Sequence, residues 1–275
     1  MGKRLQRSGE GKTILVTGAA GGMGYAAAGR LAREGYLVFG LDLRLPEPVE
    51  GVTFLEADLT DPGSVARAFE AVAARTEKLD AIVHMAGRYE LGSLLELEEE
   101  EFLGVWRVNL VSAWRVNRVF RPLLRPGGRI LITTSELAPL DPLPFTGIYG
   151  ITKTALEKYA FSLRMEAQLL GLKVIVLRPG AVDTGLLDVS TRRLEDFCRG
   201  TENYKVSAER FRRIVDRVEA RKIPPERISE LAVRALASRR PRYVYSVNRN
   251  PLLRILSALP ARLQCAVISG ILKGT

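Results

Sequence analysis

The chain has 275 residues, 47% of them hydrophobic, and a mean hydropathy of +0.03, values typical of one large globular domain. No run of about 18 apolar residues occurs, and the opening MGKRLQRSGEGK lacks the apolar segment of a signal peptide, which argues against a membrane-spanning or secreted protein. The two cysteines lack metal-ligand spacing, so we expect a cytoplasmic protein with reduced thiols, no metal site and no nucleic-acid partner. The net charge of +10 is unevenly placed: residues 190–275 carry 19 basic and 8 acidic residues, and the rest of the chain carries 22 and 23.

Seven short apolar runs alternate with longer stretches of helical periodicity, after a basic segment over residues 1–11. The runs span residues 13–17, 36–43, 52–57, 81–86, 129–134, 173–178 and 243–247. Near-continuous apolar strands joined by helical crossovers predict a parallel sheet that is covered on both faces. We therefore expect a single α/β domain over residues 12–248, with a doubly wound parallel sheet of the Rossmann type.

The first predicted strand, TILVT, continues into TGAAGGMG (residues 17–24) and then into a predicted helix. A glycine-rich turn in this context is typical of a dinucleotide site. Small residues let the backbone approach a pyrophosphate, and the helix N-terminus near Gly22 offers free N–H groups and the positive end of the helix dipole. We predict that the turn binds a dinucleotide through Gly18, Ala20, Gly21, Gly22, Met23 and Gly24.

Asp42 ends the second predicted strand. A carboxylate at this place can accept hydrogen bonds from both hydroxyls of the adenosine ribose, and it would repel a 2′-phosphate. Arg44 could in principle hold such a phosphate, but no basic residue lies between Thr17 and Gly24. We therefore predict that NAD is preferred over NADP as the cofactor.

Tyr149 and Lys153, in the segment YGITK, lie one turn apart on one face of a predicted helix. Free tyrosine has a pKa of about 10, and we expect the Lys153 ammonium to favour the phenolate, so that Tyr149 exchanges a proton with a substrate oxygen. Ser135 closes the fifth predicted strand at the carboxyl edge, where such sheets bind ligands. We expect its hydroxyl to hold the same oxygen, with Thr134 as the alternative if the register differs.

The glycine spacing TGxxxGxG, the serine and the YxxxK pair, in this order, resemble the short-chain dehydrogenase/reductase family over residues 12–185. The resemblance implies that Lys153 also holds the nicotinamide ribose, and that Asn109, in VWRVNLVSAW, holds a water that connects the lysine to solvent. Further implied cofactor contacts are Asp58, Leu59, Ala86, Gly87, Pro179, Gly180, Val182 and Thr184. The segment HMAG (84–87) departs from the family's NNAG, and we expect a packing role for His84, the only histidine.

The resemblance implies an NAD-dependent alcohol dehydrogenase or carbonyl reductase, which interconverts a secondary alcohol and a ketone. Asn109, Ser135, Tyr149 and Lys153 would be its catalytic residues. One alternative is a nucleotide-binding sensor without catalysis. Another is a sugar-nucleotide epimerase or dehydratase, whose usual TGxxGxxG spacing differs from the spacing found here.

Residues 185–224 carry little strand signal, and the resemblance implies that they form a lid over the substrate. Its candidate apolar anchors are Leu186, Leu187, Leu194, Phe197, Tyr204 and Phe211, and the loop after Ser135 adds Leu137, Leu140, Leu143 and Phe145. The chain resembles the branch that contains 17β-hydroxysteroid and retinol dehydrogenases, which implies a bulky apolar, steroid- or lipid-like small-molecule substrate. A 3-oxoacyl thioester reductase is the runner-up.

Two features predict interaction surfaces. The long helices expected over residues 100–124 and 148–170 carry more apolar residues than one sheet face needs, including Phe102, Trp106, Trp114, Tyr159 and Phe161, which predicts a homodimer or homotetramer. The tail over residues 249–275 combines leucine and isoleucine at helical spacing with four basic residues, and no acidic residue follows Glu230. This pattern fits a helix on an anionic membrane surface, or a tail that packs over the substrate pocket or a partner subunit.

Overall fold

Seven parallel strands form one sheet in the order β3-β2-β1-β4-β5-β6-β7, which confirms the doubly wound fold. The computed structural model describes residue 9 and residues 11–273, without the side chains of residues 186–190 and 219, so the basic segment 1–11 and the proposed anchors Leu186 and Leu187 lie largely outside the described part. The strands are β1 (Thr13–Thr17), β2 (Leu37–Asp42), β3 (Val52–Glu56), β4 (Leu79–His84), β5 (Leu124–Thr133), β6 (Lys173–Pro179) and β7 (Val244–Val247).

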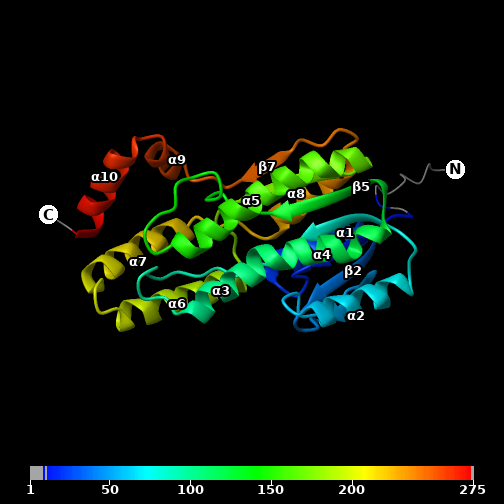
Figure 1. Ribbon diagram of the computed structural model, residues 1–275, viewed down its shortest axis with the longest axis horizontal. Helices are drawn as coiled ribbons and strands as arrows, with labels where there is room; N and C mark the ends of the chain where they lie inside the picture. Colours follow the sequence, from blue (N-terminus) through cyan, green and yellow to red (C-terminus); the bar gives the residue numbers. More distant parts are fainter. Residues whose placement is uncertain (1–8, 10, 274–275) are drawn as a thin grey trace.

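Helices cover both faces of the sheet because successive strand residues point to opposite sides. In β1, Ile14 and Val16 pack with α1 (Gly22–Arg33) and α8 (Glu226–Ala237), whereas Leu15 packs in the core with α2 (Pro62–Ala73), α4 (Ser112–Phe120) and α5 (Gly147–Ala167). Figure 1 shows α4 and α5 running along one face of the sheet. The strand order reverses between β1 and β4, and ligands of doubly wound sheets bind beside this point at the carboxyl ends of the strands.

The single helix expected over residues 100–124 is interrupted. It consists of α3 (Glu99–Trp106), a π-helical turn η1 (Arg107–Val111), α4 and a 3₁₀ turn η2 (Arg121–Leu123). Apolar periodicity continues through the π turn, and the turn contains no glycine or proline that would mark it in the sequence. Such turns are frequent at functional sites, and this one contains Asn109.

Strand β5 differs from its expected span at both ends. It begins at Leu124, because the Arg-Pro-Gly-Gly segment is part of the strand although it has the composition of a turn. The pairing with β4 shifts in register here, between Leu79 and Ala81. It ends at Thr133, so Ser135 does not close the strand as expected but lies in the turn that follows.

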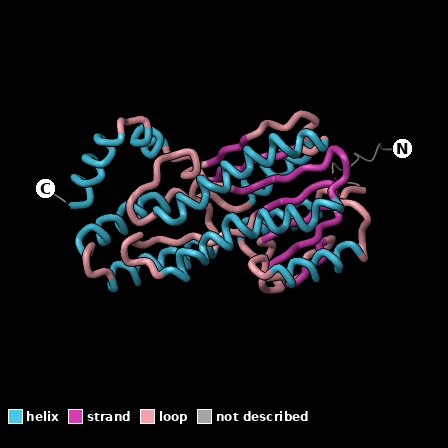
Figure 2. The backbone as a smooth tube through the Cα atoms, in the orientation of Figure 1, coloured by secondary structure: helices cyan, strands magenta, loops and turns pink. Residues whose placement is uncertain are grey.

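The far end of the molecule is helical. The segment 185–224 forms α6 (Gly185–Gly200) and α7 (Lys205–Glu219), and the tail forms α9 (Pro251–Ser257) and α10 (Ala261–Lys273). Figure 2, in the orientation of Figure 1, shows these helices gathered at the end of the molecule away from the strands. A separate apolar cluster, which we call the lid cluster, joins α6, α7 and α10, and it includes Phe145, Leu194, Phe211, Val215 and Leu272. No helix among the described residues is both long and apolar enough to span a bilayer.

Candidate active site

The glycine turn after β1 has the geometry of an anion site. Gly18 adopts a φ of +69°, and a Cβ atom there would lie 2.5 Å from the Ala86 nitrogen; a Cβ at Gly24 would lie 1.9 Å from the Gly18 carbonyl oxygen. Helix α1 begins after Gly21 with no side-chain cap and no acidic residue in its first turn. Its first N–H groups therefore remain available to a phosphate, which fits the predicted pyrophosphate.

Asp42 lies at the end of β2, beside this turn. Its Oδ2 accepts a hydrogen bond of 2.8 Å from the Ala20 N–H, and its Oδ1 accepts one of 2.7 Å from the Leu43 N–H. Each oxygen keeps a further lone pair for a ribose hydroxyl. Arg44 is exposed and borders the same cleft, so the chain presents a carboxylate and a guanidinium within two residues.

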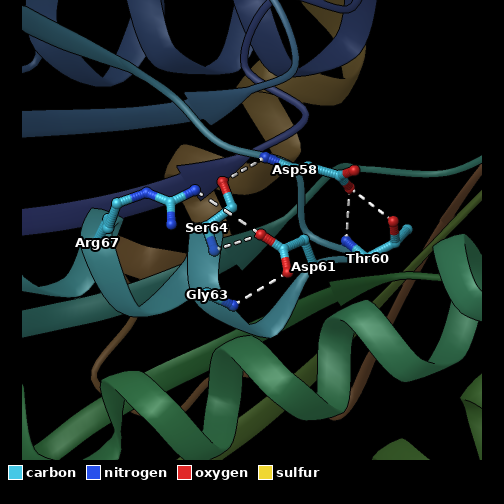
Figure 3. Close-up of polar contacts among 6 residues, drawn as sticks. All are labelled: Asp58, Thr60, Asp61, Gly63, Ser64 and Arg67. Atoms are coloured by element: carbon cyan, nitrogen blue, oxygen red, sulfur yellow. Dashed lines mark hydrogen bonds and ion pairs between the residues drawn. The ribbon is translucent and has the colours of Figure 1, made fainter.

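Asp58 and Leu59 belong to the turn after β3, in which Figure 3 shows the contacts of Asp58. The Asp58 Oδ1 accepts hydrogen bonds of 2.7 Å from both the backbone N–H and the hydroxyl of Thr60, while Asp61 caps α2 by accepting from the N–H groups of Gly63 and Ser64. This turn holds Leu59 against the cleft. All the predicted cofactor residues from Gly18 to Gly87 line this one cleft, which has a volume of about 630 Å³.

Tyr149, Ser135 and Lys153 converge at a second, adjoining cavity. Ser135 forms a side-chain hydrogen bond with Tyr149, and the Lys153 Nζ lies 5.8 Å from the centre of the Tyr149 ring and donates to the Thr133 carbonyl at 3.2 Å. The Thr134 hydroxyl instead donates to the Leu177 carbonyl and to Glu157. The structure therefore joins Ser135, and not the alternative Thr134, to the tyrosine.

The expected lowering of the Tyr149 pKa by Lys153 is not found. Burial raises the pKa of Tyr149 to about 12, the hydrogen bond with Ser135 opposes this shift, and the Glu136 carboxylate adds to it. Burial also lowers the pKa of Lys153 to about 8. Both groups lie in a low-dielectric site that disfavours their charged forms, an effect that the helical spacing does not reveal.

Asn109 lines neither of the two cavities. Its Nδ2 donates to the Arg88 carbonyl and to the Thr152 hydroxyl, both at 2.9 Å, and its Oδ1 accepts from the Arg88 N–H at 2.7 Å. A Cβ on Gly87 would lie 3.5 Å from the Asn109 Oδ1 and 3.3 Å from the Lys153 Nζ. The asparagine thus braces the loop after β4 against α5, next to the lysine.

The two cavities meet at Met23, Met85, Gly87 and Thr184, which border both. Pro179, Gly180 and Val182 line the Tyr149 cavity together with Lys153 and Thr184. A dinucleotide whose pyrophosphate lies at α1 would therefore extend its far end towards Tyr149. Among the described residues, no group of three histidine, cysteine, aspartate or glutamate side chains could hold a metal ion.

Tyr89 and Glu136 are among the residues of the Tyr149 cavity that the sequence did not predict. Tyr89 packs edge-on against Tyr149, with ring centres 4.5 Å apart, and Leu253 of α9 joins the cavity wall. Glu136 is buried beside Ser135, where burial raises its carboxyl pKa and its Oε2 accepts a 2.5 Å hydrogen bond from the Asn250 N–H. The only sequence feature that could have predicted a place for Glu136 in the site is its position directly after Ser135. Leu253 belongs to the tail, and its place in the cavity wall agrees with the expected alternative in which the tail packs over the substrate pocket.

His84 is buried at the end of β4, outside the site. Its Nε2 lies 2.8 Å from the Asn117 Oδ1, and Asn117 donates to the Tyr159 hydroxyl at 2.9 Å. Burial lowers the pKa of His84 to about 4, with the Asn117 hydrogen bond acting against the shift. The histidine therefore packs between β4, α4 and α5.

Comparison with known proteins shows the family to which the chain belongs. The short chain dehydrogenase model matches residues 12–194. The chain is 27% identical to the 3-ketodihydrosphingosine reductase of Bacteroides thetaiotaomicron over 89% of this chain and 90% of that protein. A short chain dehydrogenase/reductase from Burkholderia phymatum in complex with NAD superposes with a TM-score of 0.74 at 22% identity, over 94% and 95% of the two chains. An alcohol dehydrogenase from Thermococcus sibiricus complexed with 5-hydroxy-NADP gives 0.67 at 27% identity, over 86% and 95%. The chain belongs to the short-chain dehydrogenase family of NAD(P)-dependent oxidoreductases.

Proposed function

We propose that the protein is an NAD(H)-dependent carbonyl reductase or alcohol dehydrogenase that acts on a lipid-like ketone or secondary alcohol. The observation that carries the proposal is the convergence of Tyr149, Ser135 and Lys153 on a cavity that adjoins the dinucleotide cleft. The nicotinamide would supply or accept the hydride. Ser135 would hold the substrate oxygen, and Tyr149 would exchange the proton with it.

The ionisation states of Tyr149 and Lys153 at neutral pH are compatible with reduction. With its pKa raised to about 12, Tyr149 is a neutral phenol at pH 7, which is the form that donates a proton to a carbonyl oxygen being reduced. Oxidation requires the phenolate instead. The pKa of about 8 for Lys153 means that its ammonium, which would orient the cofactor ribose, is lost as the pH rises above that value.

The cavity wall supports an apolar substrate. The loop after Ser135 contributes Leu137 and Leu143 to the wall, and α9 contributes Leu253. Helix α7 contributes Phe211, Ile214, Val215 and Val218. Its volume of about 160 Å³ is small beside the ~300–1,000 Å³ of typical small-molecule sites. An aliphatic chain fits this space more readily than a fused ring system, for which α7 would have to move.

Tyr149→Phe tests the reaction. Because only the proton-donating hydroxyl is removed, we expect turnover to fall by about a thousandfold or more, while NADH binding persists. Turnover is followed by NADH absorbance with a panel of long-chain ketones, 3-oxoacyl thioesters, steroids and retinoids, and binding is followed by NADH fluorescence. Tyr159→Phe is the control, since it removes a hydroxyl from the same helix at a point where it bonds only Asn117 in the described contacts.

Two results would contradict the proposal. Wild-type protein that binds NADH but turns over no member of the panel would favour a nucleotide-binding sensor. A Tyr149→Phe variant as active as Tyr159→Phe would remove the tyrosine from the mechanism. Preference for the 3-oxoacyl thioesters would instead select the thioester reductase, for which the basic C-terminal third offers a surface to an acidic carrier.

A further inference from the structure

Helix α10 has two apolar faces, and only one of them is packed. Leu272 is buried against the lid cluster, and Ile268, one turn earlier, packs there as well. Leu263, Val267 and Ile271 follow each other at four-residue intervals and are 53%, 41% and 49% exposed. An ordinary surface helix has one apolar stripe, so this second stripe needs another explanation.

Helix α9 extends the exposed apolar surface. Leu252 and Ile255 are 67% and 63% exposed, although Leu253 between them lines the substrate cavity. We call the five residues Leu252, Ile255, Leu263, Val267 and Ile271 the outer apolar surface. It belongs to the two helices at the end of the molecule away from the strands (Figure 1).

The charged residues of α9 and α10 themselves are all basic. Arg254, Arg262 and Lys273 are exposed, and no carboxylate forms an ion pair with them among the described residues. The neighbouring Asp141 accepts a hydrogen bond from Gln264, and no acidic residue follows Glu230 in the chain. Apolar side chains interleaved with unpaired cations are the composition of a helix that lies in the interface of an anionic bilayer.

The tail is held firmly beside the substrate cavity. The Asn250 N–H at the start of α9 donates to Glu136, and the Asp141 N–H donates to the Ser257 hydroxyl at 3.3 Å. With Leu272 buried in the lid cluster, these contacts fix both helices to the loop after Ser135 and to α7. The outer apolar surface therefore keeps its orientation relative to the cavity and needs no refolding to meet a ligand.

We propose that α9 and α10 dock the enzyme on an anionic lipid surface, with the outer apolar surface in the acyl boundary and the basic residues at the headgroups. A second copy of the chain is a poorer occupant, because a two-fold contact would bring the same unpaired cations face to face. The lid helices and the cavity would then lie next to the bilayer, where a lipid-like substrate of the proposed reaction is concentrated. The docking itself requires no turnover.

The test is sedimentation of the full-length protein with vesicles, in the absence of substrate and cofactor. We expect binding to vesicles of phosphatidylcholine with phosphatidylglycerol, little binding to phosphatidylcholine alone, and a fall in binding between about 0.05 M and about 0.5 M salt. Leu263→Gln/Val267→Gln/Ile271→Gln should lower the partition coefficient on the order of a hundredfold, because apolar contact with the acyl boundary is lost. Arg254→Gln/Arg262→Gln/Lys273→Gln should lower it by a similar factor.

Matched controls use exposed residues outside the tail. Arg75→Gln/Lys78→Gln/Arg121→Gln removes three surface charges, and Leu37→Gln/Leu95→Gln removes two exposed leucines; neither should change binding. All variants must retain the wild-type melting temperature.

The proposal is overturned if the protein stays in the supernatant at low salt, if neutral and anionic vesicles bind equally, or if the charge variant binds like wild type. A molecular mass that falls in the apolar tail variant without vesicles would assign the surface to a second copy.

Discussion

His84 illustrates a buried titratable residue that serves the fold and not the chemistry. Its ring lies at the end of β4, hydrogen-bonded to Asn117, and burial lowers its pKa to about 4 from an ordinary value near 6.5. Between these two pH values the unfolded chain binds a proton at His84 that the native protein does not bind. Stability contributed by the neutral imidazole is therefore present above about pH 6.5 and is lost as the pH falls towards 4.

His84→Asn tests this linkage. A pKa shift from 6.5 to about 4 corresponds to about 3 kcal/mol of stability that is lost on acidification. Asparagine has no titratable group, so this loss is absent from the variant, and its amide still offers a donor to the Asn117 Oδ1. We expect urea unfolding to show a smaller drop in the free energy of unfolding from pH 7 to pH 4.5 in the variant than in wild type. Carboxylates titrate in both proteins and cancel in the comparison. Equal drops would show that His84 is not the buried neutral group.

At the scale of elements, the dinucleotide cleft depends on the join between the glycine turn and the end of β2. Asp42 connects the two by accepting a hydrogen bond from the Ala20 N–H. The two residues that follow it, Leu43 and Arg44, also line the cleft. A carboxylate at this place would favour NAD(H) by accepting hydrogen bonds from the ribose hydroxyls, and the guanidinium of Arg44 would favour NADP(H). We propose that Asp42 dominates, because it is partly buried and fixed by two backbone donors, whereas Arg44 is exposed.

Asp42→Asn separates charge from geometry. The amide oxygen can still accept the Ala20 N–H, but the charge that repels a 2′-phosphate is gone, so we expect the ratio of kcat/KM for NADH over NADPH to fall about tenfold or more. Steady-state kinetics with both cofactors gives the ratio. Asp58→Asn, a change of charge in the same cleft away from β2, should leave the ratio unaltered. A wild-type preference for NADPH would show that Arg44 governs the choice.

For the whole molecule, a second exposed apolar surface suggests self-association. Trp114 on α4, Phe161 and Met165 on α5, and Leu169 and Leu170 on the 3₁₀ turn η3 (Gln168–Leu170) are all exposed. Phe102, Trp106 and Tyr159, also expected at an interface, are only partly exposed. Figure 1 shows the C-terminal half of α5 towards the end of the molecule opposite α10, so this surface is separate from the outer apolar surface.

We predict a homodimer, or a homotetramer that contains this dimer, through α4 and α5. Phe161→Ser/Met165→Ser should lower the mass measured by light scattering towards the single-chain 30.4 kDa, because the apolar contact is lost. Leu252→Ser/Ile255→Ser changes equally exposed residues of α9 and should leave the mass unchanged. Wild-type protein of single-chain mass at micromolar concentration would refute the prediction.

The sequence alone determined the strand pattern, the glycine turn and the tyrosine–lysine pair. These features are local: strand and helix periodicity follows from which side chains point inward, and the positive φ of Gly18 belongs to one residue. The π turn at Asn109 was not predicted because its apolar pattern is that of a regular helix. The early start of β5 was not predicted because the segment has the composition of a turn.

Only the tertiary structure decided the electrostatics of the site and the placement of the tail. The pKa of Tyr149 depends on burial by segments far along the chain and on Glu136, whereas helical spacing shows only that Lys153 is a neighbour. The tail carries apolar residues around much of its circumference, so periodicity could not tell which stripe packs on the lid. Leu253 and Leu272 face the interior because other elements pack against them, whereas no described element covers the exposed side chains of α10. The burial of a side chain depends on these long-range contacts and not on local periodicity.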